Sequence, residues 1–199
     1  MALLIPFARV WGGLVSKGWA GVGLVVSAVL AAGGADLPAP LASPQEHQVK
    51  AVFLFNFAQF VEWPTNAFAE AQAPLVIGVL GDDPFGAYLD ETVRGERVNN
   101  RKLVVRRFRR VEEIQSCHVL FISPSEAERL EQILAALKGR PILTVSDAEG
   151  FSRRGGMIRF VTEKNKIRLK INPEAAKAAR LTISSKLLRP SDIVSPGRD

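Results

Sequence analysis

The sequence predicts an α/β fold: a mostly parallel sheet with helices on both faces and a C-terminal β-hairpin at the sheet edge. Short apolar runs typical of buried strands alternate with segments that begin on helix-capping residues, as in parallel sheets with crossover helices. Two further runs alternate between apolar and polar residues across a short polar turn, which indicates a hairpin. The expected strands are residues 75–80, 103–108, 119–122 and 142–145, and the hairpin arms are residues 157–162 and 167–171.

Four helix starts share one feature, a good N-cap residue followed at once by proline. A glutamate three residues after the cap adds a capping box at the first and third starts. The first helix is expected to end before Pro64 and the last near Arg189, because proline cannot continue a helix. The four starts are Ser43–Pro44, Asp83–Pro84, Ser123–Pro124 and Asn172–Pro173.

Apolar residues dominate the first helix. Its expected buried face contains Val49, Phe53, Phe57 and Phe60, widened by Leu54, Phe55 and Val61. Only a narrow polar stripe is left, which predicts a mostly buried helix packed on the sheet. The alternative is that part of the phenylalanine surface, Phe53, Phe57 and Phe60, docks a partner protein or forms a homodimer.

The leader, residues 1–35, has the pattern of a secretory signal peptide. Arg9 and Lys17 are its only charges, and a short apolar stretch ends in small residues near Ala35, where cleavage is expected. Retention as a membrane anchor is the alternative, although the apolar part is shorter than the roughly 20 residues that a spanning helix needs. Residues 36–42 are then a linker, 43–189 the α/β domain and 190–199 a disordered tail.

The charge pattern narrows the choice of partner. Removing the leader takes away two basic side chains and lowers the formal charge from +6 to +4. Either an ordinary solvated face or a surface for an acidic protein or anionic lipid explains the remaining basic clusters. Export argues against nucleic acid as a partner. The clusters are Arg106, Arg107, Arg109 and Arg110, and Lys164, Lys166, Arg168 and Lys170.

No motif for catalysis, a cofactor or a metal is visible. The chain lacks a glycine-rich phosphate loop, a metal-ligand spacing and a nucleophile with a partner base, so an enzyme is the weaker hypothesis. Its single cysteine, Cys117, adjoins an apolar run and is expected to be a buried, unreactive thiol. A hydrolase or transferase that uses the loop of Asp147 and Arg153 is the remaining catalytic alternative.

Polar residues follow several of the expected strands. Ligands of open α/β sheets usually bind at the carboxyl ends of the strands. The sequence therefore predicts a site for a small polar ligand there, although Asp83 and Ser123 nearby are better explained as helix caps. The candidate ligand-binding residues are Asp82, Ser125, Asp147 and Arg153.

Five segments in order resemble the YfiR family of periplasmic proteins. They are VKAVFLFNFAQFVEWP, LVIGVLGDDPFG, CHVLFIS, ILTVSDAEGF with GGMIRF, and IRLKIN followed by LTISSKLL. The resemblance implies a non-enzymatic periplasmic regulator that binds the periplasmic part of an inner-membrane diguanylate cyclase, represses it and thereby lowers cyclic di-GMP and biofilm formation. The alternative is a periplasmic small-ligand sensor that acts on a histidine kinase or another membrane receptor.

Two further expectations concern the docking mode and a departure of this chain from its relatives. Pairing at the sheet edge through the basic hairpin, with Arg168 and Lys170, is one expected docking mode. Some relatives pair cysteines, and a partner for Cys117 would fall near Gly78 on the first strand. Because position 78 is glycine, redox control through an internal disulfide is not expected.

Overall fold

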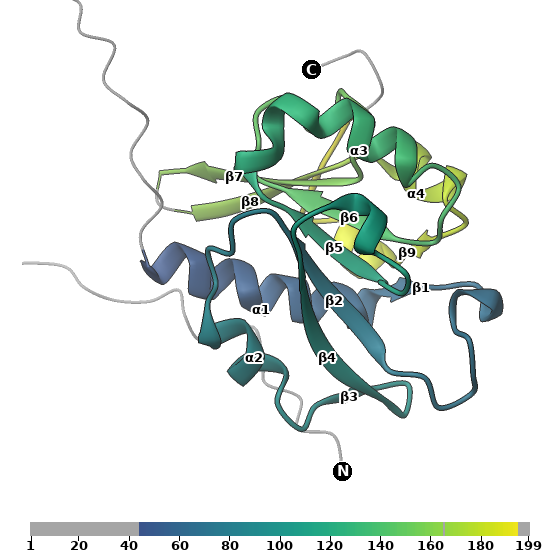
Figure 1. Cartoon of the computed structure of the whole chain (residues 1–199). Coiled ribbons are helices and arrows are strands. Elements are labelled where there is room, and N and C mark those ends of the chain that lie inside the picture. The colour runs from purple at the N-terminus through teal and green to yellow at the C-terminus, as the bar shows by residue number, and fades with distance from the viewer. Residues whose placement is uncertain (1–43, 165, 195–199) are drawn as a thin grey trace, which may run out of the picture. The chain divides into compact units, whose positions relative to one another are not determined.

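The computed structural model, which describes residues 44–164 and 166–194, places helices on both faces of one eight-stranded sheet (Figure 1). The strand order is β10-β8-β7-β6-β5-β2-β4-β3. The expected leader, the linker and Ser43 lie outside the described residues. The strands are β2 (Leu75–Leu80), β3 (Arg97–Val98), β4 (Arg101–Phe108), β5 (Val119–Ile122), β6 (Leu143–Ser146), β7 (Ile158–Glu163), β8 (Lys166–Ile171) and β10 (Asp192–Ile193).

Five helices and a short ribbon complete the described part. The ribbon pairs β1 (Val61–Glu62) with β9 (Thr182–Ile183) in antiparallel register. Three 3₁₀ turns cover residues 65–67, 111–113 and 124–129. The helices are α1 (Pro44–Phe60), α2 (Ala87–Val93), α3 (Leu130–Ala136), α4 (Pro173–Ala178) and α5 (Ser185–Leu188).

The sheet is parallel from β4 to β7, and β7 and β8 form the expected antiparallel hairpin. The chain leaves β2 for β4 on one side and returns to β5 on the other, so the order reverses between β2 and β5. Only two residue pairs, Val145↔Ile158 and Ser146↔Arg159, join β6 to β7. Most of the hairpin therefore extends beyond its neighbour β6.

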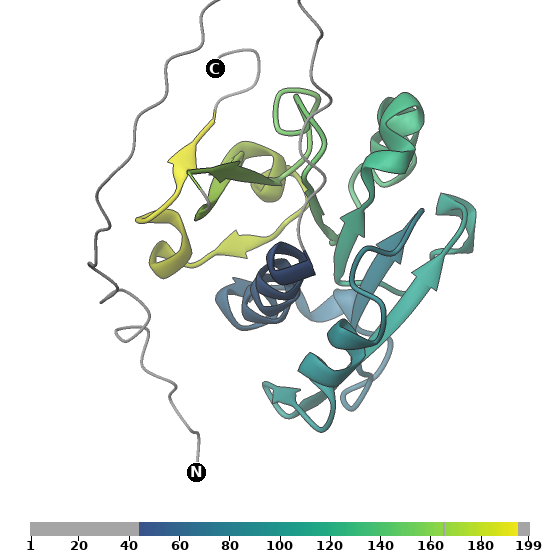
Figure 2. The ribbon, with the colours of Figure 1, turned by 90° about the vertical axis from the view of Figure 1, so that its left-hand side faces the viewer.

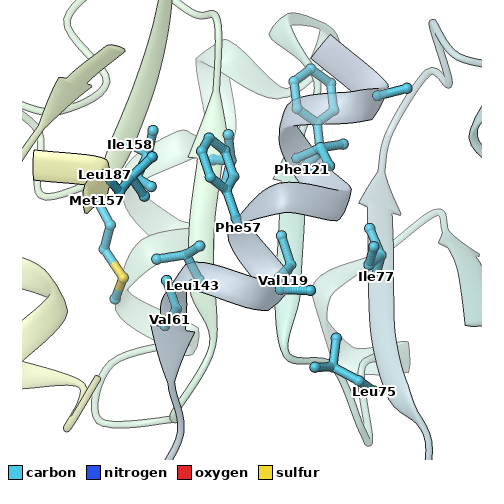
Figure 3. Close-up of a cluster of buried hydrophobic side chains, with 14 of the residues drawn as sticks. Phe57, Val61, Leu75, Ile77, Val119, Phe121, Leu143, Met157, Ile158 and Leu187 are labelled. Carbon is cyan, nitrogen blue, oxygen red and sulfur yellow. The ribbon is translucent and has the colours of Figure 1, made fainter. Parts of the chain in front are cut away.

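The two faces of the sheet carry separate apolar clusters, because successive side chains of a strand point to opposite faces. Phe57 of α1 packs with Ile77, Val119 and Phe121 on one face (Figure 3). Leu130 and Ile133 of α3 pack with Leu80, Leu120 and Ile122 on the other face. Figure 2, which views α1 nearly along its axis, shows this helix flanked by the C-terminal elements on one side and α2 on the other.

Local capping chemistry works at two of the expected helix starts. Ser123 Oγ accepts a hydrogen bond from Ser125 N at 3.3 Å, and Asn172 Oδ1 accepts one from Ala175 N at 3.0 Å. The start expected at Asp83 is wrong: Asp83 Oδ1 accepts from Phe85 N and Gly86 N and so caps a turn. Helix α2 begins only at Ala87, after Gly86 with φ of 52°.

Three further expectations are corrected. Val49 is 47% exposed, because the buried stripe of α1 runs through Lys50, Leu54 and Phe57 instead. The segment after Pro190 is not a disordered tail throughout: Asp192 and Ile193 form β10, parallel to Lys170 and Ile171 of β8. Residues 195–199 lie outside the described part. The last helix, expected to run from Asn172–Pro173 to near Arg189, is interrupted: α4 ends at Ala178, and β9 separates it from α5, which ends at Leu188 before Pro190.

Candidate functional site

At the carboxyl edge, the order reversal between β2 and β5 is the usual position of a ligand crevice, and here the loops after the two strands contact each other. Ser125 Oγ accepts a hydrogen bond from Asp82 N at 3.1 Å. It also lies 2.6 Å from the position that a Cβ on Gly81 would occupy. The structure therefore brings Asp82 and Ser125 together through a direct contact between the two loops.

Asp147, the third predicted ligand residue, holds a buried lysine. Lys50 of α1 is 2% exposed, and its Nζ lies 2.7 Å from Asp147 Oδ2 and 2.7 Å from Glu46 Oε1. The ring of Phe160 lies 5.9 Å from the same Nζ. One cation thus bridges two carboxylates and ties α1 to the loop after β6. We name Glu46, Lys50 and Asp147 the Lys50 triad.

The triad carries more negative than positive charge. Burial alone would raise the pKa of Glu46, but hydrogen bonds from Lys50 and Thr162 and the charge of Lys50 outweigh it, so the pKa lies below its usual value. Asp147 Oδ1 is buried and has no hydrogen-bond partner among the described residues. The positive charge of Lys50 therefore offsets the free-energy cost of removing both carboxylates from water.

Lys50 was absent from the predicted site, although the sequence held a signal for it. It occupies the same helical stripe as Leu54 and Phe57, both of which are buried. A cation in such a stripe has to find a carboxylate or reach water. Glu46, one turn earlier, was visible as one partner; Asp147 was not, because it lies 97 residues away.

Arg153, the fourth predicted ligand residue, lies with a different set of side chains. Arg153 and Asp147 lie on different faces of the sheet. Val145 of β6 belongs to the face that packs on α1. Ser146 and its cross-strand neighbour Arg159 point to the other face, because side chains alternate along a strand. Arg153 lines a small hollow with Arg159 and Lys170. The four predicted ligand residues therefore occupy three separate places.

The outer face of the hairpin is basic. Alternation puts Ile167, Leu169 and Ile171 of β8 in or against the α1 core, so the residues between them face the other way. Across the hairpin they pair as Glu163↔Lys166, Val161↔Arg168 and Arg159↔Lys170. Arg168 Nε forms an exposed ion pair with Glu163 at 3.3 Å. We name this surface the basic face; its residues are Arg159, Val161, Glu163, Lys166, Arg168 and Lys170.

The phenylalanines of α1 divide between core and surface. Phe57 is fully buried and stacks on Phe160 with ring centroids 5.9 Å apart, so the prediction that it docks a partner is wrong for this fold. Phe53 also contacts Phe160 at 5.9 Å but stays partly exposed, as does Phe60. Of the three phenylalanines predicted to dock a partner, Phe53 and Phe60 remain available for contact with another molecule.

A larger hollow, of about 270 Å³, lies at the opposite, amino edge of the sheet. Trp63, Phe68 and Arg101 form its aromatic and cationic walls, and the Arg101 guanidinium lies 3.7 Å from the centre of the Phe68 ring. Arg101 Nη1 also donates to the carbonyl oxygens of Glu70 and Ala73, which fixes the loop before β2. The residue pattern at strand carboxyl ends gave no indication of this hollow.

The side chain of His118, just before β5, also contacts the loop before β2. Its Nδ1 accepts a hydrogen bond from Val76 N at 3.0 Å, its Nε2 lies 3.1 Å from Ala67 O, and its ring stacks on Phe68 at 4.3 Å. The neutral ring with its proton on Nε2 satisfies both contacts. Burial, together with the charge of Arg101, lowers the pKa of His118 from 6.5 to about 4.

Acidification is expected to destabilise the protein through His118. The unfolded chain binds a proton at this residue near pH 6.5, whereas the folded chain does so only near pH 4, so the free energy of unfolding falls as the pH drops through this window. His118 alone accounts for a loss of about 2 kcal/mol between about pH 7 and about pH 5. The measurement is urea unfolding at both pH values, for the wild type and for His118→Asn. Asparagine keeps an acceptor for Val76 N but does not titrate, so an equal pH slope in both proteins would refute this assignment.

Cys117 is a buried thiol, as expected. It is 6% exposed, and burial raises its pKa to about 12, so the thiolate is not populated near neutral pH. Its Sγ lies 2.8 Å from the position of a Cβ on Gly78, the place where the resemblance puts a partner cysteine. The glycine leaves this thiol without a disulfide partner.

Two kinds of feature are absent from the described residues. None of their helices has the length and apolarity needed to cross a membrane. They also contain no group of three or more His, Cys, Asp or Glu placed to hold a metal ion.

These features define an α/β domain whose accessible polar surfaces, the basic face and the amino-edge hollow, suit recognition of another molecule. The family model of YfiR/HmsC-like proteins matches residues 47–191, well over half of the chain. The chain belongs to the YfiR/HmsC-like family, which confirms the resemblance seen in the sequence. A search of the curated proteins found no significant match.

Proposed function

We propose that the protein is a non-enzymatic periplasmic regulator that binds the periplasmic part of an inner-membrane diguanylate cyclase and keeps the cyclase inactive. Family membership supports this proposal, because the resemblance implies this action for the best understood members. Repression lowers cyclic di-GMP and, with it, biofilm formation. In this proposal the leader, residues 1–35, directs export and is then cleaved.

The basic face is the structural observation that carries the proposal. None of its residues belongs to either apolar cluster of the described part of the chain, whereas the reverse side of the same hairpin packs on α1. Arg168 and Lys170 then contact an acidic surface of the cyclase, and Phe53 and Phe60 are further contact candidates. Exposed charges of this kind contribute mainly to the rate and specificity of association.

A second candidate function rests on the amino-edge hollow. Its volume of about 270 Å³ is close to that of small-molecule sites, and its walls combine aromatic rings with a guanidinium and the carboxylate of Glu62. This favours a small-ligand sensor that acts on a histidine kinase or another membrane receptor. In that case the ligand binds near Trp63 and Arg101 rather than at Asp82, Ser125, Asp147 and Arg153.

Deleting the gene is expected to raise cyclic di-GMP, and wild-type protein supplied in trans is expected to lower it again. A Lys166→Glu, Arg168→Glu double variant, which reverses exposed charges on the basic face, is expected to fold and to fail in this complementation. Its matched control is Lys102→Glu, Arg106→Glu, which makes the same charge change at exposed positions of β4. The readouts are cellular cyclic di-GMP and in-cell crosslinking to membrane proteins.

The outcomes separate the two candidates. Capture of a cyclase by the wild type and by the control, but not by the hairpin variant, supports the repressor. Unchanged cyclic di-GMP after deletion contradicts it, and capture of a kinase instead favours the sensor.

A further inference from the structure

Three cationic side chains converge on one small hollow at the base of the basic face. The hollow has a volume of about 10 Å³, the space of a single water molecule. Arg153 reaches it from the loop before β7, Arg159 from β7 and Lys170 from β8. Its lining contains no carboxylate and consists of Gly150, Ser152, Arg153, Arg159, Lys170 and Val194.

Two of these cations, Arg159 and Lys170, repel each other at close range. Arg159 and Lys170 lie directly opposite each other on neighbouring strands, and like charges in this position destabilise a sheet. Arg159 Nε is buried and has no hydrogen-bond partner among the described residues. Asp192 pairs with Lys170 along β10, but it is exposed and does not line the hollow. A buried donor without a partner, in a ring of cations, indicates a missing acceptor.

We propose that this hollow is a binding site for one oxyanion group, of the carboxylate or phosphate type. Such a group offers several acceptor oxygens to the guanidinium and ammonium groups around it, and charge-assisted hydrogen bonds of this kind are the strong ones. Because the hollow has room for one water-sized atom, one oxygen of the anionic group enters it and the rest of the group stays in solvent. Ser152, which is 3% exposed and donates from Oγ to Lys170 O at 3.4 Å, fixes the loop against β8 and so helps to hold the cations in place.

The site does not depend on the cyclase as partner. A free anion and an acidic side chain of a docked protein present the same chemistry to these three residues. If the natural ligand is a free anion, a small anion alone is sufficient to bind. If it is an acidic side chain, the rest of the docked protein contributes to binding as well.

The test is a titration of the purified full-length protein with inorganic phosphate and, separately, with acetate, at ionic strength held constant with sodium chloride. At an anion concentration ten times Kd, binding is expected to raise Tm by about 3–6 °C. Phosphate also stabilises proteins in general by exclusion from their surfaces, so the comparison between variants decides the result. Arg159→Met and Lys170→Met are expected to lose the specific part of the shift.

Arg168→Met is the matched control. It removes one positive charge from the same face of β8, but Arg168 does not line the hollow and is 55% exposed on its side chain. It is expected to keep the full shift. A shift that is absent in the wild type, or equal in all three variants, overturns the proposal. A shift with phosphate alone identifies a phosphoryl group, and a shift with both anions identifies a carboxylate as a sufficient ligand.

Discussion

Replacing Lys50 by methionine is expected to lower the free energy of unfolding by about 3 kcal/mol. Methionine keeps most of the apolar stem but removes the charge that bridges Glu46 and Asp147. Both carboxylates then face each other without a cation, and Asp147 Oδ1 already lacks a partner among the described residues. The side chains of Glu46 and Asp147 are 17% and 18% exposed, so water relieves part of the cost. The measurement is equilibrium unfolding in urea.

The double variant Lys50→Met, Asp147→Asn separates loss of the ion pair from loss of packing. It is expected to recover part of the stability, because the amide carries no charge that needs a partner. Lys177→Met, at an exposed position of α4, is the control for losing a lysine and is expected to change stability by less than about 0.5 kcal/mol. A Lys50→Met protein within about 1 kcal/mol of the wild type would show that the triad is not the link described here.

The variant Gly156→Ala is expected to be similarly destabilised, by about 3 kcal/mol. An added Cβ would collide with Cε1 of Phe151, whose ring is fully buried. The ring cannot swing into solvent, so the loop between β6 and β7 has to shift. That loop carries Ser152 and Arg153, so the anion-induced shift in Tm is expected to decrease as well. Thermal and urea unfolding measure the first effect.

The double variant Phe151→Leu, Gly156→Ala tests whether the ring is the cause. Leucine leaves space where the Cβ would collide, so the double variant is expected to lose less stability than the two single changes together. If the double variant loses as much unfolding free energy as the two single variants together, the ring is not the cause. The loss would then come from another contact, for example the backbone hydrogen bond from Gly156 N to Phe151 O.

The strands were the part of the fold that local sequence predicted best. The runs at 75–80 and 119–122 coincide with β2 and β5, because apolar residues buried on both faces leave little ambiguity about the element. Short strands such as β3, β1, β9 and β10 were missed. They contain two residues each, so their pairing depends on what lies beside them and not on any pattern of their own.

The candidate site was predicted less well, and the reason is geometric. The sequence places Asp82, Ser125, Asp147 and Arg153 after strands but does not say on which face of the sheet each side chain emerges. The register of β6 with β7 decides that Asp147 turns to α1 and Arg159 to the other face. The same register brings Arg159 opposite Lys170 and so creates the cationic hollow.

The fold class, the longer strands and the family follow from the sequence alone, because hydrophobic runs, caps and family motifs are each continuous in the chain. The sequence also placed the basic residues on one hairpin. Only the tertiary structure decided that Lys50 is buried between two carboxylates, one of them 97 residues away, that Phe57 belongs to the core, and that a hollow opens at the amino edge. Each of these depends on contacts between segments far apart in the chain, and a local pattern carries no information about which distant side chain will meet it.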